Sequence, residues 1–298
     1  MGEDASSRIE IALEQAVDLA VASPTPPRFA RAFRHAVFPG GQRLRPRLAL
    51  EVAAACGDRA PALADSVGVA IEFIHCGSLV HDDLPCFDDA SIRRGRPTVH
   101  EAFGEALAVL VGDGLIVAAF EALGRVGAQH PAELAKLVAI VARAAGQPAG
   151  IVSGQAWESE PAPDLRVYHQ LKTAALFEAA VQGGALAGGG DPHAWRGLGG
   201  AIGEAYQIAD DLHDVLARPT ELGKPVGQDA ALGRPSAVED YGIAGAFDAL
   251  DRARARALTR IPECPGREGL EAWVDGLIAR VTPNAASVAR EQVALGVR

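Results

Sequence analysis

The chain has 298 residues and a formal net charge of −10, and 49% of its residues are hydrophobic but only 5% aromatic. This length allows one large domain or two ordinary ones, with enough apolar residues for a buried core. The negative charge argues against nucleic acid as a partner, because a protein that binds a polyanion needs a basic surface.

The first ten residues, MGEDASSRIE, lack the basic region and the apolar core of a signal peptide. The longest apolar run, Ala106 to Ala119, is interrupted by Asp113 and is shorter than the roughly 18 residues that a membrane span requires. The four cysteines form no CxxC pair, which is typical of reduced thiols rather than of a zinc site or a disulfide framework. We therefore expect a cytoplasmic protein with no stable membrane insertion.

Apolar residues recur at helical spacing along most of the chain, and the abundance of Ala favours helices. In chain order, the predicted helices cover residues 8–22, 28–37, 63–82, 105–124, 132–145, 164–188, 195–217, 243–260 and 268–281. No stretch alternates between apolar and polar residues as a half-buried strand does, and no fixed repeat or long linker divides the chain. The prediction is one all-α domain over residues 1–298.

Two Gly-rich segments, residues 183–190 and 197–203, fall inside or beside these helices. A glycine inside a helix costs about 1 kcal/mol relative to Ala, so the segments need a physical reason. We expect that their glycines allow neighbouring helices to pack closely.

Gly40 and Gly41 precede a basic stretch, QRLRPR at residues 42–47, in an otherwise acidic protein. One interpretation is the exposed start of a helix. An anion-binding site is favoured, because glycines let a ligand approach the backbone and the planar guanidinium of Arg matches a phosphate.

The densest charge in the chain is HDDLPCFDD at residues 81–89, which RRGRPT follows at residues 93–98. On an unbroken helix Asp82 and Asp88 would lie about 240° apart, too far round to bind one ion. Pro85 prevents that helix, because its ring clashes with the carbonyl four residues earlier, so the chain can turn and bring both carboxylates together. Alone, this motif is as consistent with a solvated acidic loop as with a metal site.

A second acidic cluster, DDLHD at residues 210–214, decides between these interpretations. Asp210 and Asp214 share one helix face, with Asp211 beside them. Carboxylates this close repel one another unless a cation is present, and Mg²⁺ suits them because it prefers oxygen and is usually completed by water and substrate phosphates. Two such clusters that face each other across a cavity predict several Mg²⁺ ions around a diphosphate.

These motifs resemble those of the trans-polyprenyl diphosphate synthase family, over about two-thirds of the chain. Residues 82–88 are similar to the first aspartate-rich motif of the family, with the two-residue insertion of many bacterial members, and residues 210–214 to the second, DDxxD. The closest resemblance is to bacterial carotenoid-pathway geranylgeranyl diphosphate synthases, and it rests on residues 74–76, 150–160 and 168–170.

The resemblance implies an isoprenoid-synthase-type bundle of helices around a central cavity, and a homodimer. It also implies a reaction in which an allylic diphosphate ionises, the carbocation alkylates the double bond of isopentenyl diphosphate, and a proton is lost. Mg²⁺ and cationic side chains would stabilise the leaving diphosphate, and an apolar cavity would protect the carbocation from water.

The resemblance further assigns a role to individual residues. The Mg²⁺ ligands would be Asp82, Asp83 and Asp88 on one wall and Asp210, Asp211 and Asp214 on the other. The allylic diphosphate would be bound and activated by Arg93, Lys172, Thr173, Gln207 and Lys224. The isopentenyl diphosphate would be bound by Gln42, Arg45, His75 and Arg94.

Product length in this family depends on side-chain bulk just before the first aspartate-rich motif, where the growing tail descends. Gly77 and Ser78 occupy those positions, and both are small. We therefore expect a C20 product, geranylgeranyl diphosphate, with the floor of the cavity formed by deeper side chains. Gly77→Tyr is expected to shorten the product.

Three other functions are compatible with parts of the pattern. A farnesyl diphosphate synthase would stop at C15. A terpene cyclase shares the DDxxD motif but needs no second diphosphate site, so Gly40, Gly41, Arg45, Arg94 and Lys224 disfavour it. A catalytically weak partner subunit of another prenyl synthase would tolerate eroded acidic motifs, whereas both motifs are intact here.

Gln42 stands where members of the family commonly have a lysine that binds isopentenyl diphosphate. A hydrogen bond to a charged group contributes about 1.5–3 kcal/mol, so the absence of that lysine would weaken binding about 10- to 100-fold. The residues placed to compensate are Arg43, Arg45, His75 and Arg94. We predict that Gln42→Lys lowers the KM for isopentenyl diphosphate in steady-state kinetics. An unchanged KM would show that residue 42 has no part in binding this substrate.

Overall fold

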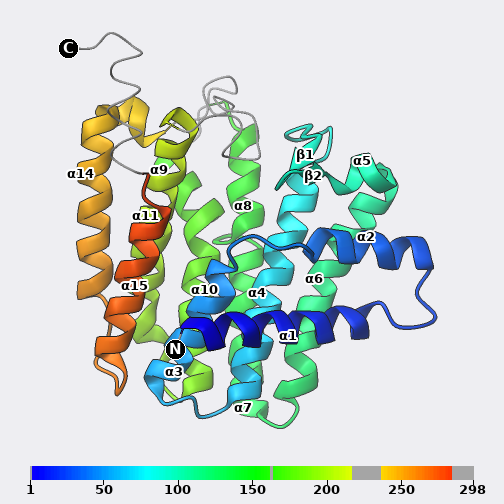
Figure 1. Cartoon of the computed structure of the whole chain (residues 1–298), viewed down its shortest axis with the longest axis horizontal. Helices are drawn as coiled ribbons and strands as arrows, with labels where there is room; N and C mark the ends of the chain where they lie inside the picture. The colour runs from blue at the N-terminus through cyan, green and yellow to red at the C-terminus, as the bar shows by residue number, and fades with distance from the viewer. Residues whose placement is uncertain (1, 162–163, 217–235, 284–298) are drawn as a thin grey trace.

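The computed structural model describes residues 2–161, 164–216 and 236–283, and within these ranges the chain is built almost entirely of helices (Figure 1). The α-helices are α1 (Gly2–Ala20), α2 (Pro27–Val37), α3 (Leu44–Cys56), α4 (Pro61–Asp82), α5 (Val99–Phe103), α6 (Glu105–Gly127), α7 (Pro131–Ala145), α8 (Ile151–Ala156), α9 (Leu165–His169), α10 (Ala175–Gly188), α11 (Pro192–Leu216), α14 (Ala237–Thr259) and α15 (Arg267–Val281). A 3-10 helix (Trp157–Ser159) follows α8, and a π-helical segment (Gln170–Ala174) joins α9 to α10. Strands β1 (Ile92–Arg93) and β2 (Arg96–Pro97) form an antiparallel hairpin.

Proline sets several of the helix boundaries. Pro27, Pro61 and Pro131 each stand in the first turn of a helix, where a missing backbone N–H costs nothing and the fixed φ favours the helix. Periodicity predicts these helices correctly and confirms the all-α class. It does not reveal α3, because nearly all residues of α3 are buried and the helix has no polar face.

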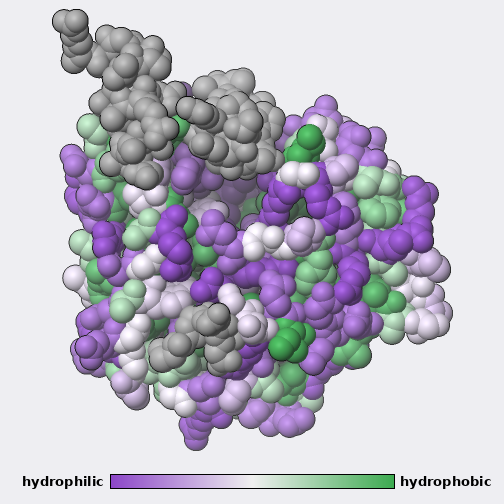
Figure 2. Space-filling view, in the orientation of Figure 1, coloured by the Kyte–Doolittle hydropathy of each residue, from purple (hydrophilic) through white to green (hydrophobic). Residues whose placement is uncertain are grey.

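The core is organised around α4, which packs against α6, α3 and α10, while α10 packs in turn against α11. Figure 1 shows the long helices roughly upright, with α1 and α2 crossing in front of them. Hydrophilic side chains cover most of the face shown in Figure 2. The whole arrangement leaves the C-terminal end of α4, and with it Asp82, at a fixed place among the surrounding helices.

Two helices, α4 and α6, are long and apolar enough to cross a membrane by length and composition. In α4 78% of the most apolar 18-residue window is buried, so its apolarity belongs to the core. In α6 the corresponding share is 39%, and Val109, Leu110 and Val117 are exposed. An apolar face of α6 therefore lies on the surface of the single chain.

Glycines let three of the helices cross closely, as the sequence predicts. A Cβ on Gly184 of α10 would lie 2.2 Å from the carbonyl oxygen of Ala49 in α3. A Cβ on Gly199 of α11 would lie 2.4 Å from the Cα of Glu178 in α10. Both distances are far shorter than a van der Waals contact, so α10 could not pack this closely against either neighbour with larger residues there.

We predict that Gly184→Ala lowers the free energy of unfolding by about 1–3 kcal/mol, the usual cost of overpacking, even though Ala is the better helix former. The matched control is Gly124→Ala in α6, where a Cβ would meet nothing within 4 Å. This control should leave stability unchanged or raise it slightly. Chemical denaturation measures both, and equal effects at the two positions would contradict the packing explanation.

Candidate active site

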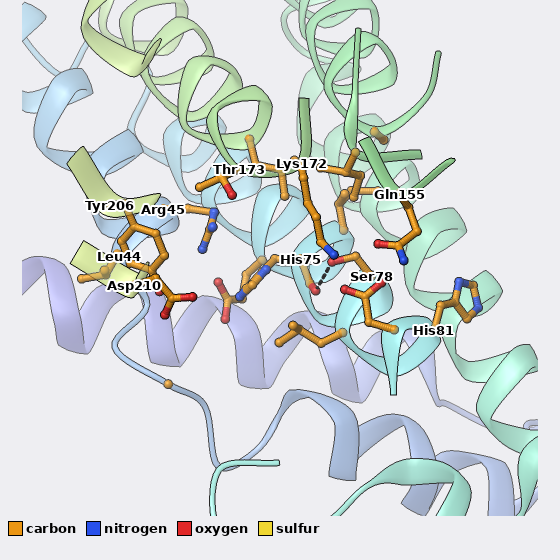
Figure 3. A pocket seen from close by; sticks show the side chains of 18 of the residues that line it. Leu44, Arg45, His75, Ser78, His81, Gln155, Lys172, Thr173, Tyr206 and Asp210 are labelled. Carbon is orange, nitrogen blue, oxygen red and sulfur yellow. Dashed lines mark hydrogen bonds between the residues drawn. The ribbon is translucent and has the colours of Figure 1, made fainter. Parts of the chain in front are cut away.

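A cavity of about 1140 Å³ lies among the helices, and its lining changes character from one helix to the next (Figure 3). Helices α6 and α7 contribute apolar side chains, namely Ile116, Phe120, Ala142 and Ala145. Helices α3, α4 and α11 contribute charged and polar ones, namely Arg45, His75, Ser78, Asp82, Tyr206 and Asp210. One cavity therefore offers both an apolar compartment and a charged one.

The loop after α4 brings the first acidic motif back on itself, as predicted from Pro85. The backbone N–H of Asp88 donates to the carbonyl oxygen of Asp82 over 2.9 Å, and that of Ala90 donates to Asp83 over 3.1 Å. Asp82 lines the cavity, whereas Asp88 lies outside its lining. The pKa of Asp82 is raised to about 6, mainly by burial; the charge of Lys172 opposes this shift and the charge of Asp88 adds to it.

Asp83 is paired with Arg93 and does not face the cavity. Its carboxylate is buried, accepts a hydrogen bond from Nε of Arg93 over 2.7 Å and forms an ion pair with Nη2 of the same residue over 2.5 Å. It does not line the cavity, whereas Arg93 does. Asp83 therefore holds Arg93 in this structure, and its expected role as a metal ligand stays a prediction.

In the second acidic motif, too, one carboxylate faces the cavity and the others are buried behind it. Asp210 lines the cavity, but Asp211 is buried and accepts hydrogen bonds from Nε2 of Gln207 and from the backbone N–H of Ala237, both over 2.8 Å. Asp214 is also buried and outside the cavity lining. Because Ala237 begins α14, Asp211 stabilises the positive N-terminal end of that helix. Two of the three expected ligands on this wall thus lie in the packing behind it.

The two carboxylates that line the cavity, Asp82 and Asp210, are suitable ligands for Mg²⁺. Among the residues that the structure describes, no three Asp, Glu, His or Cys side chains come close enough to hold an ion by themselves. Asp82 and Asp210 reach the cavity from α4 and α11, and Figure 3 shows Asp210 across the cavity from Ser78, one turn before Asp82. Mg²⁺ is commonly held by one or two carboxylates completed by water and substrate phosphates, which matches this donor set.

Cations without partners face the same cavity. Arg45 is 9% exposed, its Nε has no hydrogen-bond partner, and its guanidinium lies over the rings of Phe177 and Tyr206 at 4.5 and 5.4 Å. Arg94 forms no hydrogen bond or ion pair with any described residue. Burial, together with Arg45 and Arg94, holds the pKa of His75 well below its usual value, so the imidazole is neutral. Unpaired buried cations are costly, and an anionic ligand would satisfy them.

Arg43 lines the cavity, but its guanidinium already has partners within the protein. Its guanidinium donates to Glu72 over 2.6 Å, to Glu10 over 2.8 Å and to the carbonyl oxygen of Val37 over 2.9 Å. All three nitrogens thereby donate hydrogen bonds beneath the loop that carries Gly40. A Cβ added at Gly40 would clash with the guanidinium. Carboxylates from α1 and α4 thus hold Arg43 at the edge of the cavity, and its expected compensation for Gln42 stays a prediction.

Comparison with known proteins agrees with this geometry. The sequence model of the polyprenyl synthetase family matches residues 26–260. The chain belongs to the polyprenyl synthetase family. A geranylgeranyl diphosphate synthase of Cereibacter sphaeroides is 50% identical over 276 residues, which cover 93% of this chain and 96% of that relative. Another, of Rhodobacter capsulatus, is 50% identical over 267 residues, 90% of this chain and 92% of that one.

Solved structures of the family share the fold. The geranyltransferase of Legionella pneumophila superposes with a TM-score of 0.79 at 27% identity, and covers 94% of each chain. The Helicobacter pylori geranyltransferase, solved with magnesium and isoprenyl diphosphate, has a TM-score of 0.77 at 26% identity over 92% of this chain and 97% of that one. The resemblance read from the two acidic motifs is thus confirmed at the level of family and fold.

In this polyprenyl synthetase, Lys172 belongs to a network that the sequence did not predict. Lys172 stands on the π-helical segment, lines the cavity and forms an ion pair with Glu158. Glu158 also accepts hydrogen bonds from Nε2 of Gln155 over 2.7 Å and from the hydroxyl of Tyr168 over 2.6 Å. The network holds the ammonium of Lys172 near Asp82. Lys224, expected beside Lys172, lies outside the described residues.

Thr173 and Gln207 lie together, but of the two only Thr173 lines the cavity. The hydroxyl of Thr173 donates to Oε1 of Gln207 over 2.6 Å, and Gln207 donates to Asp211. The chain of hydrogen bonds fixes the amide orientation of Gln207, so the position of this pair depends on α11 and on the start of α14.

Gly77 and Ser78, expected to control product length, point in different directions. Ser78 lines the cavity, but Gly77 does not. A Cβ on Gly77 would lie 3.2 Å from the carbonyl oxygen of Gly112 and 3.4 Å from Leu115, both in α6. A tyrosine at position 77 would push α4 and α6 apart before it could shorten the cavity, so Gly77→Tyr is not a clean test of product length.

We predict that Asp82→Asn stabilises the metal-free protein at pH 7.5 by about 1–3 kcal/mol, because it removes a buried charge near Asp88. The pKa of Asp82 is raised to about 6 from its usual value of 3.8, so its carboxyl favours the folded state in acid and loses that contribution as the pH rises through about 6. The difference between variant and parent should shrink as the pH falls from 7.5 to 5.

Asp83→Asn is the matched control: burial raises the pKa of Asp83 too, but its carboxylate is paired with Arg93, so the substitution leaves Arg93 unpaired and should lower stability at pH 7.5. Denaturant unfolding in the presence of a chelator measures both variants. If Asp82→Asn destabilised the protein at pH 7.5 as Asp83→Asn does, the assignment of Asp82 as a strained, ligand-facing carboxylate would be wrong.

Proposed function

We propose that the protein is a Mg²⁺-dependent trans-prenyltransferase that condenses isopentenyl diphosphate with allylic diphosphates, with geranylgeranyl diphosphate as its main product. The observation that carries the proposal is that Asp82, Asp210 and two guanidinium groups without a carboxylate partner among the described residues, those of Arg45 and Arg94, all face one cavity. Two relatives named geranylgeranyl diphosphate synthases, each 50% identical to this chain, support the product.

The allylic diphosphate would bind between the two acidic walls. Asp82 and Asp210 would hold Mg²⁺, with Asp88 close to Asp82, and the ions when bound would neutralise charge on the diphosphate as it leaves. Arg93, oriented by Asp83, and Lys172 would contact the same diphosphate. Asp83, Asp211 and Asp214 would act behind the walls as supports rather than as ligands.

The isopentenyl diphosphate would bind without metal, at the cationic side of the cavity. Arg45 and Arg94 supply unpaired charge, and the neutral His75 and the amide of Gln42 supply hydrogen bonds. This division explains how a protein of net charge −10 can bind two diphosphates. One diphosphate is screened by metal, and the other is paired directly with guanidinium groups.

The apolar part of the cavity would hold the growing prenyl tail. The lining from α6 and α7 has no charged side chain, and it would keep water from the allylic carbocation. Thr173, whose hydroxyl is oriented by its hydrogen bond to Gln207, would present its oxygen dipole toward the site of ionisation, and Gln207 would support it from behind the lining. Neutral dipoles of this kind stabilise a cation without reacting with it.

We also propose that the protein is a single-domain, cytoplasmic homodimer. The buried side chains of the described residues form one continuous core, which supports a single domain. The exposed apolar face of α6, with Val109, Leu110 and Val117, supports a second copy of the chain as the partner that covers it. Light scattering on the purified protein would give a mass of twice the 30.9 kDa chain, whereas a monomer would contradict the proposal.

The function is tested by incubation of the purified protein with Mg²⁺, isopentenyl diphosphate and each of the C5, C10 and C15 allylic diphosphates, followed by sizing of the products. A C20 product from each starter, lost on chelation of the metal, is expected. A product that stops at C15 would favour a farnesyl diphosphate synthase. Hydrocarbon products would favour a cyclase, and activity seen only with another synthase present would favour a partner subunit.

We predict that Phe120→Ala shifts the main product beyond C20, because Phe120 is the largest apolar side chain that α6 contributes to the cavity lining. Val117→Ala is the control, since Val117 lies on the same helix but is 67% exposed and does not line the cavity. It should leave the product unchanged. Chromatography of the dephosphorylated alcohols measures the product length of both variants. An unaltered product from Phe120→Ala would show that this residue does not limit the length of the prenyl chain.

A further inference from the structure

We propose that Arg96 and His35, which lie outside the cavity, position the hairpin that carries Arg93 and Arg94 and thereby set the affinity for isopentenyl diphosphate. The proposal rests on the proposed function and deepens it, because it assigns positioning residues to one of the two substrates. It is carried by the hydrogen bonds, the backbone conformation and the packing of the hairpin.

The hairpin is short and strained. Strands β1 and β2 pair only through Ile92 with Pro97 and Arg93 with Arg96. The two residues of the turn, Arg94 and Gly95, have φ values of 53° and 72°. Positive φ at both positions is typical of a two-residue hairpin turn, but it is unfavourable for Arg and persists only where surrounding contacts impose it.

Three hydrogen bonds hold strand β2 of the hairpin against the C-terminal end of α2. Arg96 donates from Nη1 to the carbonyl oxygen of Phe38 over 2.7 Å and from Nη2 to Nδ1 of His35 over 2.9 Å. A guanidinium has no acceptor, so Nδ1 must be unprotonated and the proton lies on Nε2. That Nε2–H donates to the carbonyl oxygen of Pro97 over 2.8 Å. Both strand positions of β2 are thus tied to the C-terminal end of α2.

Packing beneath the hairpin is incomplete. A cavity of about 50 Å³ separates Arg93, Arg94 and Arg96 from Cys76 and Val80 of α4, which is room for a water molecule. Ile92 is 51% exposed and does not anchor the hairpin in the core. Because Ile92 does not anchor the hairpin, its position depends on polar ties: Arg93 to Asp83 on the β1 side, and Arg96 and His35 on the β2 side.

The two arginines of the hairpin depend on these ties to different degrees. Arg93 has a second anchor in Asp83. Arg94 has no such partner, and its guanidinium lies against the backbone of Gly41, where a Cβ would come within 3.0 Å of Nη2. Phe38, the acceptor for Arg96, lies three residues before Gly41. Arg96 therefore fixes the distance between the two loops that would enclose isopentenyl diphosphate, with little effect on Arg93.

The test is Arg96→Ala in the full-length protein, with separate KM values for the two substrates. The KM for isopentenyl diphosphate should rise about 10-fold while the allylic KM and kcat change less than about threefold. Arg96→Lys, whose ammonium can reach one acceptor but not both, should give an intermediate KM. Arg28→Ala is the control, since Arg28 also ties α2 to a carbonyl oxygen, that of Phe103, over 2.8 Å, but away from the hairpin.

A double-mutant cycle separates positioning from a general loss of stability. If Arg96 acts through Arg94, Arg96→Ala should have no further effect on the isopentenyl diphosphate KM once Arg94→Ala is present. Full additivity, or an unchanged KM in Arg96→Ala and Arg96→Lys, would overturn the proposal. Absence of condensation by the unaltered protein would instead overturn the proposed function, so the two failures are distinguishable.

Discussion

The constraint on which the site depends is the burial of a carboxylate at the C-terminal end of α4. The helix dipole disfavours a negative charge there, burial raises the pKa of Asp82 to about 6, and Asp88 lies close enough to add repulsion. The core fixes α4 between α3, α6 and α10, so Asp82 cannot withdraw to solvent. A divalent cation with a diphosphate would relieve this arrangement. The same packing that stabilises the fold therefore creates the demand for a ligand.

The charged residues of the cavity divide into those that already have partners and those that do not. Arg43 and Arg93 are held by carboxylates, whereas Arg45 and Arg94 keep donors free. The paired arginines set the backbone around the site, and the unpaired ones remain available to an anion. This division follows from ordinary desolvation, since a buried cation must be paired either within the protein or by the ligand. It also supports our proposal that Asp83, although part of the first acidic motif, acts behind the site.

Much of the fold and the outline of the site could be predicted from the sequence. Amphipathic helices show their period, and Pro85 required the turn that brings Asp88 back to Asp82. The features that could not be predicted depend on contacts between residues far apart in the sequence. Helix α3 has no polar face to reveal it, Asp211 bonds to Ala237 from a later helix, and the orientation of Gly77 depends on where α6 lies. Spacing along the chain identifies which residues gather, but not which of them face the ligand.

The most direct test of the two-walled site is anomalous diffraction from crystals grown with diphosphate and with Mn²⁺ in place of Mg²⁺. Anomalous peaks are expected beside both Asp82 and Asp210, joined by the diphosphate, with none beside Asp83 or Asp211. Ions bound by Asp83 or Asp211, or confined to one wall, would contradict the division between ligand-facing carboxylates and supporting ones.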